Sequence, residues 1–148
     1  MRAFFKTLFA LILFTKPLFC GAQVKYEREY GLKSNQIPRQ ARSFVAACCP
    51  GSKIKWFGEE SFSGKSIEAK LGYKGSVYSI EFDTLGGIQD VEKTISLNNI
   101  VAGVRQKIIQ QLDSVFRKYA LDKAQVQWTG SGEALVQMIQ KNATTLPL

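Results

Sequence analysis

The side chains that most enzymes use for acid–base and nucleophilic chemistry are scarce in this sequence. None of the 148 residues is a histidine, which removes the commonest general base and the commonest metal ligand. A serine nucleophile would need a lysine base, and the two neighbouring pairs, Ser63 with Lys65 and Ser52 with Lys53, lie in turn-like sequence without a surrounding motif. We therefore expect no catalytic residue and no enzymatic activity.

The cysteines offer little more chemistry than the serines. Two of the three are adjacent, Cys48 and Cys49, and adjacent cysteines bond to each other only through a strained ring. The C-x-x-C spacing of redox proteins is missing, and a zinc site would have to add scattered carboxylates to this pair. We expect no metal and no cofactor, and we interpret the pair as small apolar residues at a helix end, with Cys48 turned inward.

Two groups of carboxylates could form a site. Glu81 and Asp83 alternate on one strand face and could meet a basic partner or Ca²⁺, although two carboxylates alone make a weak cation site. Glu59 and Glu60 are consecutive, so on a strand their side chains point to opposite faces. Both groups are also what the solvated side of a one-sided sheet looks like.

The first 22 residues have the features of a secretory signal peptide. A basic start with Arg2 and Lys6 is followed by a nine-residue apolar run, and small residues precede a cleavage point that we place after Ala22. The run is shorter than the roughly 20 residues of a membrane-spanning helix, so we expect no transmembrane segment after removal. A lipoprotein signal, with Cys20 acylated, is the alternative, although a large phenylalanine precedes it. We predict a periplasmic or secreted protein.

Charge argues against nucleic acid as a partner. Loss of the signal peptide lowers the formal net charge from +8 to +5, and the remaining bases are spread out with acids between them. Nucleic-acid-binding proteins usually concentrate bases on one face and add stacking aromatic side chains. A mild attraction to anionic envelope surfaces remains open.

Hydrophobic periodicity predicts an α+β domain in which amphipathic helices pack on one face of an antiparallel sheet. A polar leader, residues 23–36, has room for one short strand, and residues 142–148 form a tail. Tight turns between successive strands leave no space for parallel crossovers. The predicted elements of the domain, residues 37–141, are a helix from 37 that ends at Pro50-Gly51, strands starting near 53, 66, 76 and 88, a helix near 99–120, a strand at 124–128 and a helix at 133–141.

The stretch 76–92 is the clearest β-hairpin of the chain. Tyr78, Ile80 and Phe82 alternate with polar neighbours, so we expect these three side chains to face the helices. The opposite face of the two central strands is mixed, and it is the candidate binding face. Its residues are Glu68, Lys70, Val77, Ser79 and Glu81.

The helix near 99–120 carries the longest apolar stripe. Val101, Val104, Ile108, Leu112 and Val115 step by three or four residues. We expect this helix to lie across the sheet and cover one face.

The chain also matches itself in pattern at an offset of 72 residues. Phe44 meets Phe116 and Trp56 meets Trp128, which suggests that a helix-then-strands unit is used twice. The second copy lacks the strands that follow Trp56 in the first. We therefore expect the strand around Val126 to be poorly covered and to pair across a dimer or with another partner.

These residues carry a family likeness. The helix ending at 50–51, the strand K-I-K-W at 53–56 and the hairpin Y-S-I-E-F-D-T-L-G-G-I-Q-D-V-E at 78–92 resemble the PepSY-like domains of exported bacterial proteins, which are similar to the β-lactamase-inhibitor protein fold. The resemblance covers residues 37–128, with the second repeat truncated. It implies a periplasmic domain without catalysis. Related domains in propeptides of thermolysin-type peptidases imply peptide binding or peptidase inhibition.

Composition and resemblance together predict a non-enzymatic binding module in the cell envelope. Its expected partner is a protein or peptide, which the sequence does not identify. The alternative is a structural envelope protein without a dedicated ligand, held near anionic surfaces by its basic charge.

Overall fold

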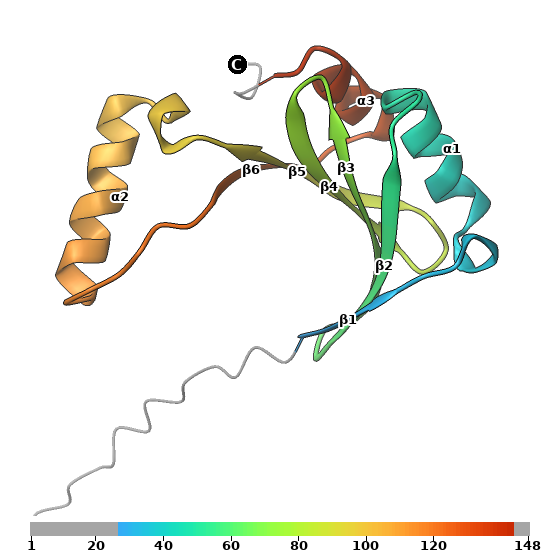
Figure 1. Cartoon of the computed structure of the whole chain (residues 1–148), viewed down its shortest axis with the longest axis horizontal. Helices are drawn as coiled ribbons and strands as arrows, with labels where there is room; N and C mark the ends of the chain where they lie inside the picture. The colour runs from blue at the N-terminus through green and yellow to red at the C-terminus, as the bar shows by residue number, and fades with distance from the viewer. Residues whose placement is uncertain (1–26, 144–148) are drawn as a thin grey trace, which may run out of the picture.

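The computed structural model describes residues 27–143, which fold as one antiparallel sheet with three α-helices (Figure 1). The predicted signal peptide and residues 144–148 of the predicted tail lie outside the described residues. The strands are β1 (Glu27–Gly31), β2 (Ile54–Ser61), β3 (Gly64–Tyr73), β4 (Ser76–Asp83), β5 (Ile88–Ile95) and β6 (Ala124–Trp128). The helices are α1 (Arg39–Cys48), α2 (Ala102–Val115) and α3 (Gly132–Gln140), with short 3₁₀ turns η1 (Ser34–Gln36) and η2 (Leu97–Asn99).

The six strands lie side by side in chain order, and every neighbouring pair is antiparallel. The antiparallel sheet and the α+β class are therefore confirmed. The predicted leader supplies β1, which forms one edge of the sheet beside β2. The strand after α2 supplies the other edge, β6.

The β4–β5 turn is fixed by one carboxylate and one glycine. Asp83 Oδ1 accepts hydrogen bonds from the backbone N–H groups of Leu85 and Gly87, both at 2.8 Å. Gly86 has φ +93°, and a Cβ there would lie 2.8 Å from the Pro38 side chain. This turn therefore touches the start of α1, which ties the hairpin to the helical layer.

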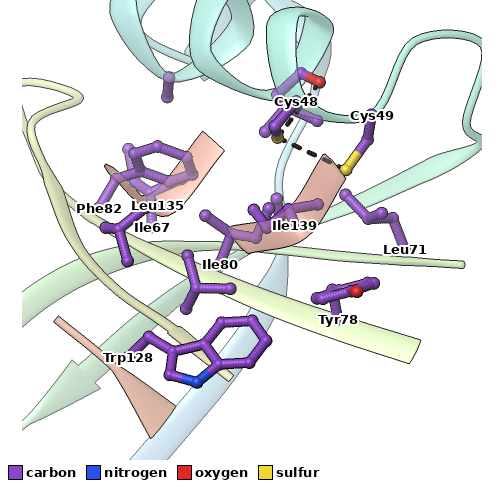
Figure 2. Packing of buried hydrophobic residues seen from close by; sticks show 14 of the residues in the cluster. Cys48, Cys49, Ile67, Leu71, Tyr78, Ile80, Phe82, Trp128, Leu135 and Ile139 are labelled. Atoms are coloured by element: carbon purple, nitrogen blue, oxygen red, sulfur yellow. Dashed lines mark hydrogen bonds between the residues drawn. The ribbon is translucent and has the colours of Figure 1, made fainter. Parts of the chain in front are cut away.

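One face of the sheet is covered by α1 and α3 and holds the hydrophobic core (Figure 2). Tyr78, Ile80 and Phe82 are completely buried there, as predicted. Ala41, Val45 and Cys48 of α1 meet Leu135, Met138 and Ile139 of α3 in the same cluster. We call this side of the sheet the covered face.

Both tryptophans and both cysteines belong to the packing of the covered face, and the cysteines lie at a helix end, as expected. Trp128 is fully buried, and Trp56 is partly buried with its ring centroid 6.0 Å from that of Phe82. Cys48 and Cys49 are buried at the end of α1, with their sulfur atoms 3.4 Å apart (Figure 2).

A buried lysine fastens the end of α3 to the covered face. Lys93, 3% exposed, donates through Nζ to the carbonyl oxygens of Asn142 and Ala143, at 3.0 and 2.9 Å. The Asn142 side chain accepts a 2.9 Å hydrogen bond from the Tyr78 hydroxyl. Burial lowers the pKa of Lys93. The first two residues of the predicted tail are thus part of the domain.

The prediction that the second helix covers the sheet is wrong. The helix α2 is shorter than expected, and none of its residues is buried. It lies beyond the ends of β5 and β6, away from α1 and α3 (Figure 1). The physical reason is that the chain after Trp128 returns as α3, whose Leu135 and Ile139 occupy the core beside α1.

Among residues 27–143, none of the helices has the length and hydropathy that a membrane span requires.

Candidate functional site: the acidic open face of the sheet

The face of the sheet opposite α1 and α3 is strongly acidic. Because side chains alternate along each strand, the registers place on this side the residues that neighbour Ser79 and Glu81 of β4. Seven of the 12 carboxylates in the sequence lie there, although the net charge of the chain is positive. We call this side the open face. Its seven carboxylates are Glu27, Glu29, Glu59, Glu68, Glu81, Asp90 and Glu92.

Glu68 is the centre of the open face. It is only 9% exposed, although none of the described helices covers this side of the strand. The hydroxyl of Ser79 donates to Glu68 Oε1, and the Lys70 ammonium lies 2.9 Å from Oε2. Lys70 also pairs with Glu29, and its Nζ lies 4.8 Å from the centre of the Phe57 ring. The ammonium of Lys70 is therefore held by two carboxylates and an aromatic face.

Three carboxylates form a row across neighbouring strands. Glu68 on β3 lies directly opposite Glu81 on β4, and Glu81 lies directly opposite Asp90 on β5. Side chains at such positions are in contact distance, and like charges there destabilise a sheet. Lys70 compensates Glu68 at one end of the row. Burial raises the pKa of Glu81 and the pKa of Asp90. The neighbouring Asp90 raises the pKa of Glu81 further, whereas hydrogen bonds with Gln127 and Glu81 partly offset the rise at Asp90.

Glu59 on β2 adds a titratable group next to this row. Partial burial, a shared hydrogen bond with Glu68 and the charges around it raise the pKa of Glu59 to about 7. At Glu68, burial alone would raise the pKa, but hydrogen bonds from Ser79, Lys70 and Glu59 outweigh burial and lower it. At neutral pH, the carboxyl group of Glu59 is therefore partly protonated and hydrogen-bonds to Glu68, which stays ionised.

Three carboxylates of this region lie close enough together to contact one metal ion. Carboxylate oxygens of Glu29, Glu59 and Glu68 lie within 4.8 Å of one another, which would allow one cation to reach all three. Ca²⁺ usually takes six to eight oxygen ligands. Lys70 already contacts two of these three carboxylates. The arrangement is therefore better suited to ammonium groups than to a multiply coordinated ion.

The five predicted face residues share the open face, as strand alternation requires. Glu68, Lys70 and Ser79 are in direct contact, and Glu81 continues their row. Val77 lies near the start of β4, before Ser79, and is 59% exposed. Asp83, the other predicted partner of Glu81, is used by the β4–β5 turn instead.

Sequence reasoning missed the carboxylates that β1 and β5 contribute, Glu27, Glu29, Asp90 and Glu92. It placed Glu59 and Glu60 on opposite faces, which the structure confirms. Glu60 pairs with Lys65 at 2.7 Å, while Glu59 joins the open face. Alternation within β5 was the one available signal for Asp90 and Glu92.

The serines considered as nucleophiles have other partners. Ser63 shares a hydrogen bond with Ser61, and Ser52 donates to the carbonyl oxygen of Gly72 at 3.1 Å. The ammonium of Lys65 is bound to Glu60. No described contact joins either serine to its neighbouring lysine.

Comparison of the chain with protein-family models, with curated proteins and with solved structures finds no significant match.

Proposed function

We propose that this protein is an exported, non-enzymatic binding module whose open face binds a lysine- or arginine-rich segment of a protein or peptide. The row Glu68–Glu81–Asp90 carries the proposal. Like charges at directly opposed positions cost stability, and such a cost is expected where a ligand of opposite charge compensates it.

Lys70 illustrates how the open face would hold a ligand's ammonium group. Its Nζ is bound by Glu29 and Glu68 and lies over the ring of Phe57. Lys70 contacts only the Glu68 end of the row. At the other end, the carboxylates of Glu81 and Asp90 lie at directly opposed positions. A cationic side chain of a ligand would take the equivalent position between those two carboxylates.

The extent of the open face favours a polypeptide over a single ion. Its seven carboxylates are spread over β1 to β5, and neighbouring strands lie about 4.8 Å apart. Several ligand charges can therefore be bound at once. The exposed side chain of Val77 and the ring of Phe57 add apolar surface for the hydrocarbon stems of lysine or arginine.

The likeness to PepSY-like domains and the predicted signal peptide support an envelope location and a protein or peptide ligand. Under this proposal, peptidase inhibition would be one use of the open face, with a basic loop of the peptidase as the bound segment. The alternative, a structural envelope protein attracted to anionic surfaces, uses the basic remainder of the molecule and leaves the open face without a role.

A binding titration tests the proposal. Decalysine and decaglutamate peptides are titrated into the protein at low salt, and calorimetry measures the heat of binding. We expect decalysine to bind, decaglutamate not to bind, and Glu81→Gln to weaken decalysine binding several-fold. Glu133→Gln, which removes the same charge from α3, is the matched control and should leave the affinity unchanged.

Three outcomes would contradict the proposal. The first is equal affinity of Glu81→Gln and Glu133→Gln, which would show attraction without a site. The second is binding of Ca²⁺ but not of decalysine, which would assign the carboxylates to a metal ion. The third is release from anionic vesicles by salt with no decalysine binding, which favours the structural alternative.

A further inference from the structure

The segment between β5 and β6 contains most of the exposed large apolar side chains of residues 27–143. We define residues 97–123, which include η2 and α2, as the α2 arm. Of the 11 large apolar side chains that are exposed in the described residues, seven belong to it. Scattered exposed apolar residues are normal, whereas a concentration of them marks an interaction surface. The seven are Val101, Val104, Ile108, Val115, Phe116, Tyr119 and Leu121.

The apolar stripe of α2 continues onto the sheet. Val101, Val104 and Ile108 follow each other at helical spacing and so share one side of the helix. Together with Ile95 of β5 and Val126 of β6 they line a groove of about 270 Å³. One apolar surface therefore runs from the arm to the last strand.

That last strand also ends the sheet. In the described residues β6 pairs with β5 on one side, and no strand lies on its other side. Exposed strand edges pair readily with other chains. When the second chain is identical, a twofold axis between two antiparallel β6 strands satisfies both edges at once.

The charges of the α2 arm are complementary to a surface that every copy of the chain carries. The arm is basic, whereas the open face is acidic. In the arm, five bases outnumber two acids. They are Arg105, Lys107, Arg117, Lys118 and Lys123 against Asp113 and Asp122. Glu92 and Asp90 line the open face of β5, one strand in from the β6 edge.

We propose that the α2 arm and the outer edge of β6 form a dimer interface with a second copy of this chain. The exposed fractions of the seven apolar side chains amount to an area on the order of 600 Å², against the ~800 Å² that each partner buries in a standard interface. The β6 edge would supply the remainder. The dimer needs no ligand on the open face, although its charge complementarity uses the carboxylates there.

Light scattering after size-exclusion chromatography, over a wide range of micromolar concentrations, tests the dimer. We expect the wild-type mass to be that of two chains. Val104→Asp and Ile108→Asp should each halve it. Both positions are in a helix without buried residues, so the variants should stay folded, which circular dichroism checks. Leu85→Asp, in the β4–β5 turn and equally apolar, is the control and should remain a dimer.

Hydrogen exchange gives a second readout at the strand itself. Amides of β6 should be protected in the wild type and exchange at least tenfold faster in Ile108→Asp, while amides of β1, the opposite edge, should not change. A wild-type protein that is one chain at every concentration would overturn the proposal. So would an Ile108→Asp variant that keeps both its mass and its β6 protection. Decalysine binding by a monomeric protein would sink the dimer and leave the proposed function standing.

Discussion

The two faces of this sheet are made by the same strands and satisfy opposite requirements. On the covered face, Tyr78, Ile80 and Phe82 are fully buried beneath α1 and α3. On the open face, the intervening positions of β4 carry Ser79 and Glu81 and belong to a field of carboxylates. The covered face therefore stabilises the fold, whereas the open face holds like charges close together at a cost. Under the proposed function, the residues of the covered face serve folding and those of the open face serve binding.

The largest expected effect is on the covered face. Phe82→Ala removes a completely buried ring that contacts Phe44 edge-to-face at 5.7 Å and lies near Trp56. We expect a loss of about 3–5 kcal/mol in the free energy of unfolding. Chemical denaturation measures it. Val77→Ala, an apolar truncation on the open face of the same strand, is the control and should cost far less, because Val77 is 59% exposed.

A smaller loss in the free energy of unfolding is expected at the hydrogen bonds that Asn142 accepts beside the covered face. Asn142→Ala removes the acceptor of the Tyr78 hydroxyl and of the Ser76 hydroxyl. A buried hydroxyl without a partner costs about 1–3 kcal/mol, so unfolding should become easier by that amount. Denaturation of the double variant with Tyr78→Phe checks the cause. If the hydroxyl is the reason, the second substitution should recover part of the loss; no recovery would refute this account of Asn142.

The open face predicts a dependence of stability on pH. The pKa of Glu59 is about 7 in the folded protein, above its ordinary value of 4.5. A carboxyl with a raised folded pKa contributes stability that is complete below pH 4.5 and is lost as pH rises through 7. Unfolding free energies should therefore fall between pH 5 and pH 8. In Glu59→Gln that fall should be smaller than in the control Glu133→Gln; an equal fall in both would contradict the assignment.

Local patterns in the sequence were sufficient for much of the fold. The alternation of apolar and polar residues identified the β4–β5 hairpin and the buried side of β4. The tight turns between successive strands identified the sheet as antiparallel. The same alternation placed Glu68, Lys70, Ser79 and Glu81 on one face. These features depend on neighbours in sequence, which is why they could be predicted.

Features that depend on distant pairing could not be predicted in this way. Glu29 reaches Lys70 because β1 pairs with β2, whose register is set across the whole of α1. Lys93 can be buried because carbonyl groups some 50 residues later in the chain accept hydrogen bonds from its ammonium group. The amphipathic pattern of α2 predicts that one side of the helix packs against another surface, but it does not identify that surface. In this chain α3, and not α2, packs beside α1 on the covered face.

We propose that the row Glu68–Glu81–Asp90 is kept for a cationic ligand at the expense of stability. Thermal unfolding of the wild type and of Glu81→Gln, each with and without decalysine, tests both halves at once. Without peptide, we predict that Glu81→Gln melts at a higher temperature than the wild type. Decalysine should raise the midpoint of the wild type by more degrees than it raises the midpoint of Glu81→Gln. A variant that melts lower than the wild type, or that gains as much from decalysine, would contradict the claim.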